Sequence, residues 1–170
     1  MNLYSKIREV QDFPKAGILF RDITPLLSDG PAYKEAIEQL SRFAKDCQAQ
    51  LIVGPEARGY VVGAPLAYAL GIGFIPVRKR GKLPAKTVAI EYQLEYGTDV
   101  LEIHEDAIAP GQRVVVADDL LATGGTMKAT VDLVQKLGGE VVGAAFLIEL
   151  QELGGRNKLT GFPVKTLLQY

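Results

Sequence analysis

Two patterns of apolar residues repeat along this chain. Short continuous apolar runs are typical of strands buried on both faces, and apolar residues spaced three or four apart are typical of one helix face. The predicted strands are 51–54, 72–77, 113–117 and 140–149, and the predicted helices are 31–47, a segment that ends near Leu70, and 125–137. Strands that alternate with helices predict an α/β fold with a central, mostly parallel sheet flanked by helices.

Two segments depart from this alternation. Residues 87–93 and 98–103 form two extended stretches that meet near Tyr96, which predicts a hairpin projecting from the sheet. Residues 1–30 are too punctuated by turn-forming residues for regular structure, and we expect them to lie over the sheet as a small cap. Because the chain has no internal repeat, low-complexity tract or linker, residues 1–170 are expected to form a single domain.

Composition and charge restrict the class of protein. The chain has 170 residues, of which 48% are hydrophobic and 23% charged, as in a typical soluble globular domain. Its formal net charge of −1 argues against nucleic acid as a partner. Cys47 is the only cysteine, which excludes an internal disulfide. No apolar run approaches the ~20 residues of a membrane span, and the first residues lack the apolar centre of a signal peptide, so we expect no membrane partner and a cytoplasmic location.

The stretch VVVADDLLATGGT at 114–126 carries the clearest chemical signal. Its apolar run ends in Asp118 and Asp119, and a loop of small residues and hydroxyls at 122–126 leads into the next helix. The backbone N–H groups of such a loop bind phosphate at a helix N-terminus. The aspartates repel that anion, so their partners are sugar hydroxyls or a metal. A phosphate beside a diol indicates a ribose phosphate.

A plainer interpretation of this stretch is helix capping, because acidic residues favour helix starts. Capping explains one carboxylate, however, and not two in succession followed by Thr-Gly-Gly-Thr. A Walker A loop is excluded because no Gly-Lys-Ser/Thr occurs, and the glycine spacing differs from that of the dinucleotide-binding fingerprint. We therefore favour phosphate binding over capping.

Two cationic groups follow other predicted strands. Arg58 lies in the tight loop GPEARG, where the crowding of small residues predicts a strained backbone, such as a non-proline cis bond. The run at 78–82 holds Arg78, Lys79, Arg80 and Lys82. Such a run is most often a solvated edge or a nucleic-acid patch, but in a chain of net charge −1 it indicates local compensation for a polyanionic ligand. Since parallel strands end at one edge, these groups are expected to converge on the phosphate loop. A ribose that carries both a monophosphate and a diphosphate fits this set.

At this point the chain resembles a known family. VVVADDLLATGGT is similar to the phosphoribosyl-diphosphate binding signature of the type I phosphoribosyltransferases. Further segments resemble the members of that family that act on adenine, in colinear order over nearly the whole chain. These segments are DFPKAGILFRDITPLL, GPEARG, VRKRGKLP, LEYG, LEIHEDAIAPGQRV, LIELQELGGRNKL and LLQY. The loop GPEARG departs from relatives that have aspartate and serine before the arginine, which leaves the roles of Glu56 and Ala57 open.

The resemblance implies the fold, the reaction and the cofactor. The fold is that of type I phosphoribosyltransferases, with residues 1–30 as an N-terminal hood and residues 81–97 as a flexible hairpin lid. The substrates are adenine and 5-phospho-α-D-ribose 1-diphosphate, and the products are AMP and diphosphate. Mg²⁺ is the implied cofactor, held mainly by substrate oxygens and not by a dedicated protein site, and a homodimer is the implied assembly.

The resemblance also implies a role for individual residues. Ala122, Thr123, Gly124, Gly125 and Thr126 would hold the 5′-phosphate, Asp118 and Asp119 the ribose hydroxyls, and Arg58, Arg78, Lys79 and Lys82 the diphosphate. Leu19, Phe20, Arg21 and Leu150 would form the base pocket, with Phe20 stacked on the purine. Glu95, a carboxylate that steers or exchanges a proton with the purine, and Arg58 are the expected catalytic residues.

Two other functions remain open on the sequence. The first is a transferase for a 6-oxopurine such as xanthine, hypoxanthine or guanine. Such a pocket needs a donor for the 6-oxo group, and no lysine near Phe20 or Leu150 clearly supplies one. The second is a non-catalytic regulator that senses phosphoribosyl diphosphate. It would need a nucleic-acid-binding domain or a broad basic face, and it would leave Glu95 without a use.

Overall fold

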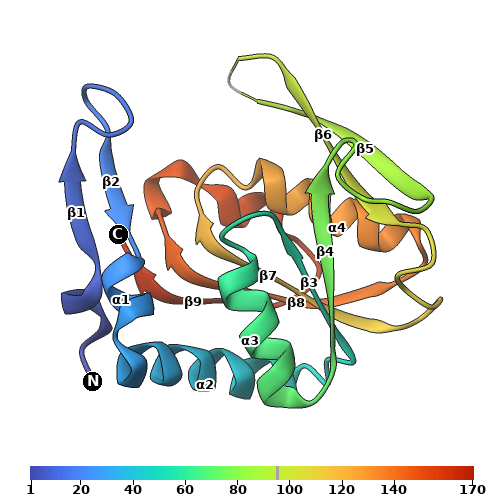
Figure 1. Cartoon of the computed structure of the whole chain (residues 1–170), viewed down its shortest axis with the longest axis horizontal. Helices are drawn as coiled ribbons and strands as arrows, with labels where there is room; N and C mark the ends of the chain where they lie inside the picture. Colours follow the sequence, from blue (N-terminus) through green and yellow to red (C-terminus); the bar gives the residue numbers. More distant parts are fainter. Residues whose placement is uncertain (95) are drawn as a thin grey trace.

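The computed structural model describes residues 1–94 and 96–170, and within them an α/β fold built on a seven-stranded sheet (Figure 1). The strands are β1 (Arg8–Gln11), β2 (Leu19–Asp22), β3 (Leu51–Pro55), β4 (Gly73–Lys79), β5 (Thr87–Gln93), β6 (Thr98–His104), β7 (Arg113–Leu121), β8 (Glu140–Glu149) and β9 (Val164–Gln169). The helices are α1 (Thr24–Ser28), α2 (Gly30–Asp46), α3 (Tyr60–Leu70) and α4 (Gly125–Lys136), with short 3-10 turns at Leu3–Lys6, Gln151–Leu153 and Gly155–Lys158.

The large sheet has the strand order β5-β6-β4-β3-β7-β8-β9. Its last five strands in this order, β4, β3, β7, β8 and β9, are parallel to one another. Side chains of β7 alternate between its two faces, because successive residues of a strand point in opposite directions. Val115 and Ala117 pack in the core with α2 and α3, and Val114 and Val116 pack in the core with α4. Helices therefore cover both faces, as the continuous apolar runs predict.

The strand order reverses between β3 and β7. The chain leaves β3 toward β4 on one side and leaves β7 toward β8 on the other. In open α/β sheets such a switch point creates a crevice at the carboxyl ends of the two strands, where ligands bind. The loop that holds Arg58 and the loop at 122–126 follow these two strands. The topology thus brings together the two loops that the sequence marks as anion-binding.

β7 is longer than predicted. The predicted strand ends at Ala117, but the observed strand continues through Asp118 and Asp119 to Leu121. Pairing with β8 extends it, since Asp118 lies opposite Phe146 and Leu121 opposite Glu149. The two aspartates therefore belong to a rigid strand and not to the following loop.

The N-terminal segment is more regular than predicted, so the expectation of irregular structure over residues 1–30 is wrong. β1 and β2 form an antiparallel hairpin, closed by a hydrogen bond from the Phe13 N–H to the Ile18 carbonyl. The punctuating residues at 12–18 form the turn between two strands, and Asp22 accepts from the Thr24 N–H at the start of α1. This hairpin lies beside the C-terminus (Figure 1), where Tyr4 packs edge-to-face on Tyr170.

The hairpin predicted after β4 is present as β5 and β6, which pair from Thr87 opposite His104 to Gln93 opposite Thr98. Its base is fixed by the buried Glu102, which accepts from the Gly81 N–H at 2.6 Å and from the Thr87 hydroxyl. These hydrogen bonds hold the pKa of Glu102 below its ordinary value. Glu102 therefore ties the start of the lid to the strand that leads out of it. Across residues 1–94 and 96–170, no helix has the length and apolarity to cross a membrane.

Candidate active site

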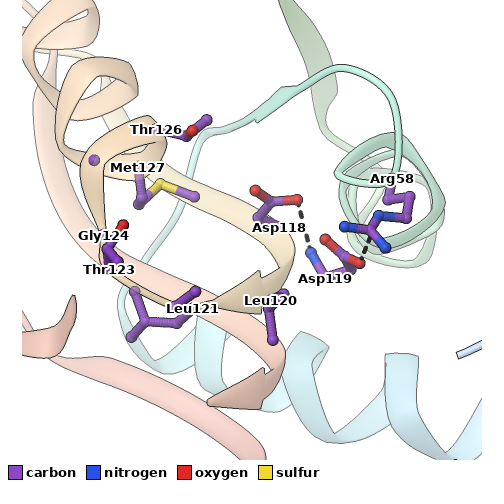
Figure 2. Close-up of a pocket in the computed structure, with 11 residues that line it drawn as sticks. Arg58, Asp118, Asp119, Leu120, Leu121, Thr123, Gly124, Thr126 and Met127 are labelled. Atoms are coloured by element: carbon purple, nitrogen blue, oxygen red, sulfur yellow. Dashed lines mark hydrogen bonds and ion pairs between the residues drawn. The ribbon is translucent and has the colours of Figure 1, made fainter. Parts of the chain in front are cut away.

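A cavity of about 200 Å³ opens at the switch point. Its lining comes from the loop after β3 and from the end of β7 with the turn into α4 (Figure 2). The lining residues are Arg58, Asp118, Asp119, Leu120, Leu121, Ala122, Thr123, Gly124, Gly125, Thr126 and Met127. Eight of the predicted site residues thus lie in one hollow, namely Arg58, the two aspartates and the five residues of the loop at 122–126.

The two aspartates differ in their environments. Asp119 is buried, with its side chain 7% exposed, and its Oδ2 accepts from Arg58 Nε at 3.1 Å (Figure 2). Asp118 Oδ1 accepts from the Asp119 backbone N–H at 2.8 Å. Desolvation, and then the charge of Asp119, raise the pKa of Asp118 well above its ordinary value. A ligand that donates hydrogen bonds or carries positive charge reduces the electrostatic repulsion between these two carboxylates.

The residues at 122–126, here called the phosphate loop after their predicted role, comprise the turn that follows β7 and the first two residues of α4. Gly124 has φ +84°, a left-handed conformation that strongly favours glycine, and α4 begins at Gly125. The N–H groups of the first helical turn have no partner within the helix. Together with the helix dipole they attract an anion into the cavity.

Arg58 connects the cavity to the N-terminal hood. Its guanidinium lies 5.4 Å from the centre of the Phe20 ring, and Phe20 stacks edge-to-face on Phe13. Phe20 lines a second hollow of about 290 Å³ with Val10, Phe13 and Asp22. An aromatic face beside the cation that borders the acidic pair fits the predicted place for a purine.

The cations at the end of β4 and just after it do not line the cavity, although the sequence predicts convergence there. Arg78 and Lys79 are instead held by Glu56, whose Oε1 accepts from Arg78 Nε at 3.2 Å and from the Lys79 N–H at 2.8 Å. Lys79 also pairs through Nζ with Asp99 Oδ2 of β6 at 3.4 Å. Lys82 is exposed, and its carbonyl accepts from Arg78 Nη1. Glu56 therefore links the Arg58 loop to the end of β4, a role that sequence reasoning missed.

The backbone of the Arg58 loop matches the prediction of a non-proline cis bond, since the Glu56–Ala57 peptide is cis.

The remaining base-pocket candidates lie on β2 and after β8. Arg21 forms an ion pair with Glu9, and its guanidinium lies 3.9 Å from the centre of the Tyr170 ring, while Leu19 is half-buried. The Leu150 N–H donates to the carbonyl of Leu121, a lining residue, at 2.9 Å, but Leu150 itself does not line the cavity. Glu95 lies outside the described residues.

The comparison with family models matches residues 27–165 to the phosphoribosyl transferase domain. An adenine phosphoribosyltransferase from Brevibacillus brevis is 59% identical over 170 residues, which are the full length of both chains. One from Clostridium perfringens is 58% identical and covers all of this chain and 99% of its own.

Solved structures are similar over the same length. The crystal structure of adenine phosphoribosyltransferase from Thermoanaerobacter pseudethanolicus superposes with a TM-score of 0.95 and 55% identity, covering 99% of this chain and 98% of its own. The enzyme from Saccharomyces cerevisiae has a TM-score of 0.93 and 38% identity, covering 98% of this chain and 96% of its own. It was crystallised with D-2,5-dideoxy-2,5-imino-altritol 1,6-bisphosphate and adenine.

Proposed function

The chain belongs to the phosphoribosyltransferase family, and on that premise we propose that it transfers the 5-phosphoribosyl group from 5-phospho-α-D-ribose 1-diphosphate to adenine. The products are AMP and diphosphate, and the role is purine salvage. The observation that carries this function is the full-length similarity to adenine phosphoribosyltransferases, at 59% identity without a gap in coverage. The yeast relative, bound to adenine and to a bisphosphate, supports the same pair of ligand classes.

The cavity supplies the interactions that this transfer requires. In the reaction a bond forms between adenine N9 and C1′ of the ribose, and the bond from C1′ to the diphosphate oxygen breaks. The proton that adenine loses passes to the departing diphosphate or to solvent. The phosphate loop holds the 5′-phosphate, and the acidic pair accepts hydrogen bonds from the ribose hydroxyls. Negative charge at Asp118 and Asp119 also stabilises the positive charge that develops on the ribose. Fixed charges in a water-poor site act without reorganisation, and alignment of the two substrates contributes roughly 7–11 kcal/mol.

Arg58 and the three cations at and just after the end of β4 take the diphosphate end in this proposal. Arg58 has half of its side chain exposed beside Asp119, so its remaining donors are open to an anion. Arg78 and Lys79 end β4 and Lys82 follows it, and closure of residues 81–97 brings Lys82 over the diphosphate beside the two strand residues. A closed lid also excludes water that would hydrolyse the activated sugar.

Mg²⁺ is the cofactor that the family implies, and the donor set bears on how it is held. The cavity offers the carboxylates of Asp118 and Asp119, one of which pairs with Arg58. Mg²⁺ requires six oxygens in octahedral geometry, so this set fits an ion held mainly by substrate oxygens and water. When bound, the ion neutralises charge on the departing diphosphate.

Base selectivity gives the test of this function. Steady-state assays with adenine, guanine, hypoxanthine and xanthine are expected to give turnover with adenine alone. The 6-amino group of adenine is a donor, which backbone carbonyls accept, whereas a 6-oxo group needs a donor such as lysine. Turnover of guanine without turnover of adenine contradicts the assignment. Binding of phosphoribosyl diphosphate without turnover of any base would favour the alternative function, a non-catalytic regulator that senses phosphoribosyl diphosphate.

Glu95 is the proposed catalytic carboxylate, carried by the lid toward the purine. Replacing Glu95 by glutamine is expected to lower kcat with adenine by about 10²-fold, the lower end of what general acid–base groups contribute. The KM for phosphoribosyl diphosphate is expected to stay unchanged, because the role proposed for Glu95 concerns the base alone. Glu91→Gln, an exposed glutamate on β5 of the same hairpin, serves as the control. Unchanged turnover together with an unchanged KM for adenine removes this role.

The active assembly in this proposal is a homodimer. The exposed face of α3 is apolar, with Ala64 and Ala69 exposed and Tyr68 90% exposed. An apolar helix face of this kind is typical of a subunit interface. Sedimentation is expected to give the mass of two 18.4 kDa chains, and Tyr68→Glu is expected to shift it toward one. A single-chain mass for the wild type at micromolar concentration rules the dimer out.

The proposed location is the cytoplasm. Cys47, the only cysteine, is half-buried, and desolvation raises the pKa of its thiol. A thiol with a raised pKa is a poor nucleophile at neutral pH, so it suits a structural role in a reducing compartment.

A further inference from the structure

Two glycines on neighbouring loops meet backbone to backbone at the floor of the cavity. One is Gly124 of the phosphate loop, and the other is Gly155, in the turn that follows β8. A Cβ on Gly124 would lie 2.7 Å from the Gly155 oxygen. A Cβ on Gly155 would overlap the Ala122 carbonyl oxygen and lie 3.0 Å from the Gly124 nitrogen. No side chain fits at either position, so the two loops are in direct backbone contact.

The residue after Gly155 fixes this contact to the sheet. Arg156 donates from Nε to Glu149 Oε1 at 3.0 Å and from Nη2 to Glu149 Oε2 at 2.6 Å. Its third nitrogen, Nη1, donates to the Val164 carbonyl of β9 at 3.0 Å. A bidentate, charge-assisted pair of this kind defines orientation as well as distance. Residues 154–158, here called the backing loop, are therefore attached to both β8 and β9.

Glu149 is the anchor of this attachment. It is 4% exposed at the end of β8, and its Oε2 also accepts from the Thr166 hydroxyl at 3.0 Å and from Gln169 Nε2 at 3.2 Å. The Arg156 hydrogen bonds hold the pKa of Glu149 below its ordinary value. The carboxylate is thus ionised and fully partnered in the neutral pH range, which removes the usual cost of burying it.

We propose that Gly155, held by the Arg156–Glu149 ion pair, is a positioning residue for the phosphate loop. By packing on the Ala122 carbonyl and on Gly124, the backing loop keeps the N–H groups of the phosphate loop aimed into the cavity before a ligand arrives. A loop that is already ordered loses less entropy on binding. This inference rests on the proposed function only in assigning residues 122–126 to the 5′-phosphate.

Gly155→Ala tests the contact directly. The added methyl displaces the Ala122 carbonyl, so the KM and the calorimetric Kd for phosphoribosyl diphosphate are expected to rise roughly 10- to 100-fold, the effect of misplacing a binding group by about 1 Å. The KM for adenine at saturating phosphoribosyl diphosphate is expected to stay within about twofold, since that substrate does not touch the loop. Gly30→Ala is the control, because a Cβ at Gly30 meets open space.

Arg156→Lys keeps the proposal falsifiable if the alanine variant fails to fold. Lysine retains the positive charge but cannot make the two parallel hydrogen bonds of a guanidinium. The KM and Kd for phosphoribosyl diphosphate are therefore expected to rise roughly three- to tenfold. Unchanged affinity for phosphoribosyl diphosphate in a folded variant overturns the proposal. Equal rises in both KM values, or lower thermal stability alone, also overturn it, because they indicate a merely structural role. If the wild type does not bind phosphoribosyl diphosphate, the proposed function fails instead.

Discussion

Replacing Asp118 by asparagine is expected to make the free protein more stable and much less active. Activity is expected to fall because the carboxylate proposed to accept from the ribose hydroxyls is lost, and removing one interacting group from a preorganised site costs about 10²–10³-fold in rate. Stability rises because Asp118 stands next to Asp119 in a poorly solvated position, where its charge is unfavourable. Asparagine keeps the oxygen that accepts from the Asp119 N–H.

The pH dependence of this stability has a defined sign. The pKa of Asp118 is higher in the folded chain than in the unfolded chain, so the folded state holds a proton that the unfolded state has released. Stability therefore falls as pH rises from the ordinary carboxyl range through the raised pKa. The asparagine variant does not lose stability in this way. Its gain in unfolding free energy over the wild type begins above the ordinary carboxyl pKa and grows until the pH has passed the raised pKa.

Thermal unfolding between about pH 4 and pH 8 measures this effect, at about 2–4 °C for each 1 kcal/mol in a chain of this size. Asp106→Asn, at an exposed loop residue, is the control and is expected to change neither stability nor activity. A wild type that is as stable as the variant over this range contradicts the electrostatic account of the acidic pair. Full activity of the variant contradicts the assignment of Asp118 to the ribose.

The second large effect is expected at Arg58. Replacing it by alanine removes the cation that pairs with Asp119 at 3.1 Å and leaves a buried carboxylate without its partner. It also removes a donor proposed for the diphosphate. We expect kcat/KM for phosphoribosyl diphosphate to fall by about 10²–10³-fold, because unpaired buried charges and lost charged hydrogen bonds each cost several kcal/mol.

Arg58→Lys separates these two contributions. Lysine restores the positive charge beside Asp119 but lacks the paired N–H donors of the planar guanidinium. We therefore expect partial recovery of stability with little recovery of diphosphate affinity. Arg42→Ala, at an exposed arginine on α2, gives the control for loss of a surface cation. Steady-state kinetics and inhibition by inorganic diphosphate measure the outcome. An alanine variant with unchanged inhibition by diphosphate shows that Arg58 does not bind that group.

The sequence predicts the sheet well, because the signal for its inner strands is strong and local. Apolar runs at 51–54 and 140–149 appear in the structure as β3 and β8 with nearly the same limits. Parallel strands connected through helices end at the same edge of the sheet. For that reason the convergence of Arg58, Asp118 and the phosphate loop follows from the sequence before any coordinates.

Features that depend on partners distant in sequence were not predictable in this way. The hood hairpin has strands of only four residues, and its turn residues hide its periodicity. The prediction omits β9 (Val164–Gln169), whose place in the sheet is set by pairing with β8. Glu56 and Gly155 act through contacts with Lys79 and Ala122, and no local pattern marks either contact.

The chemistry of the site is tested most directly by the conversion of labelled adenine to AMP. The wild type is expected to form labelled AMP only when both phosphoribosyl diphosphate and Mg²⁺ are present, with release of one diphosphate for each AMP. The Asp118→Asn variant, folded and more stable, is expected to form it about 10²–10³-fold more slowly. Absence of AMP from a folded wild-type protein with both substrates and Mg²⁺, or equal rates for the two proteins, contradicts the account of this cavity.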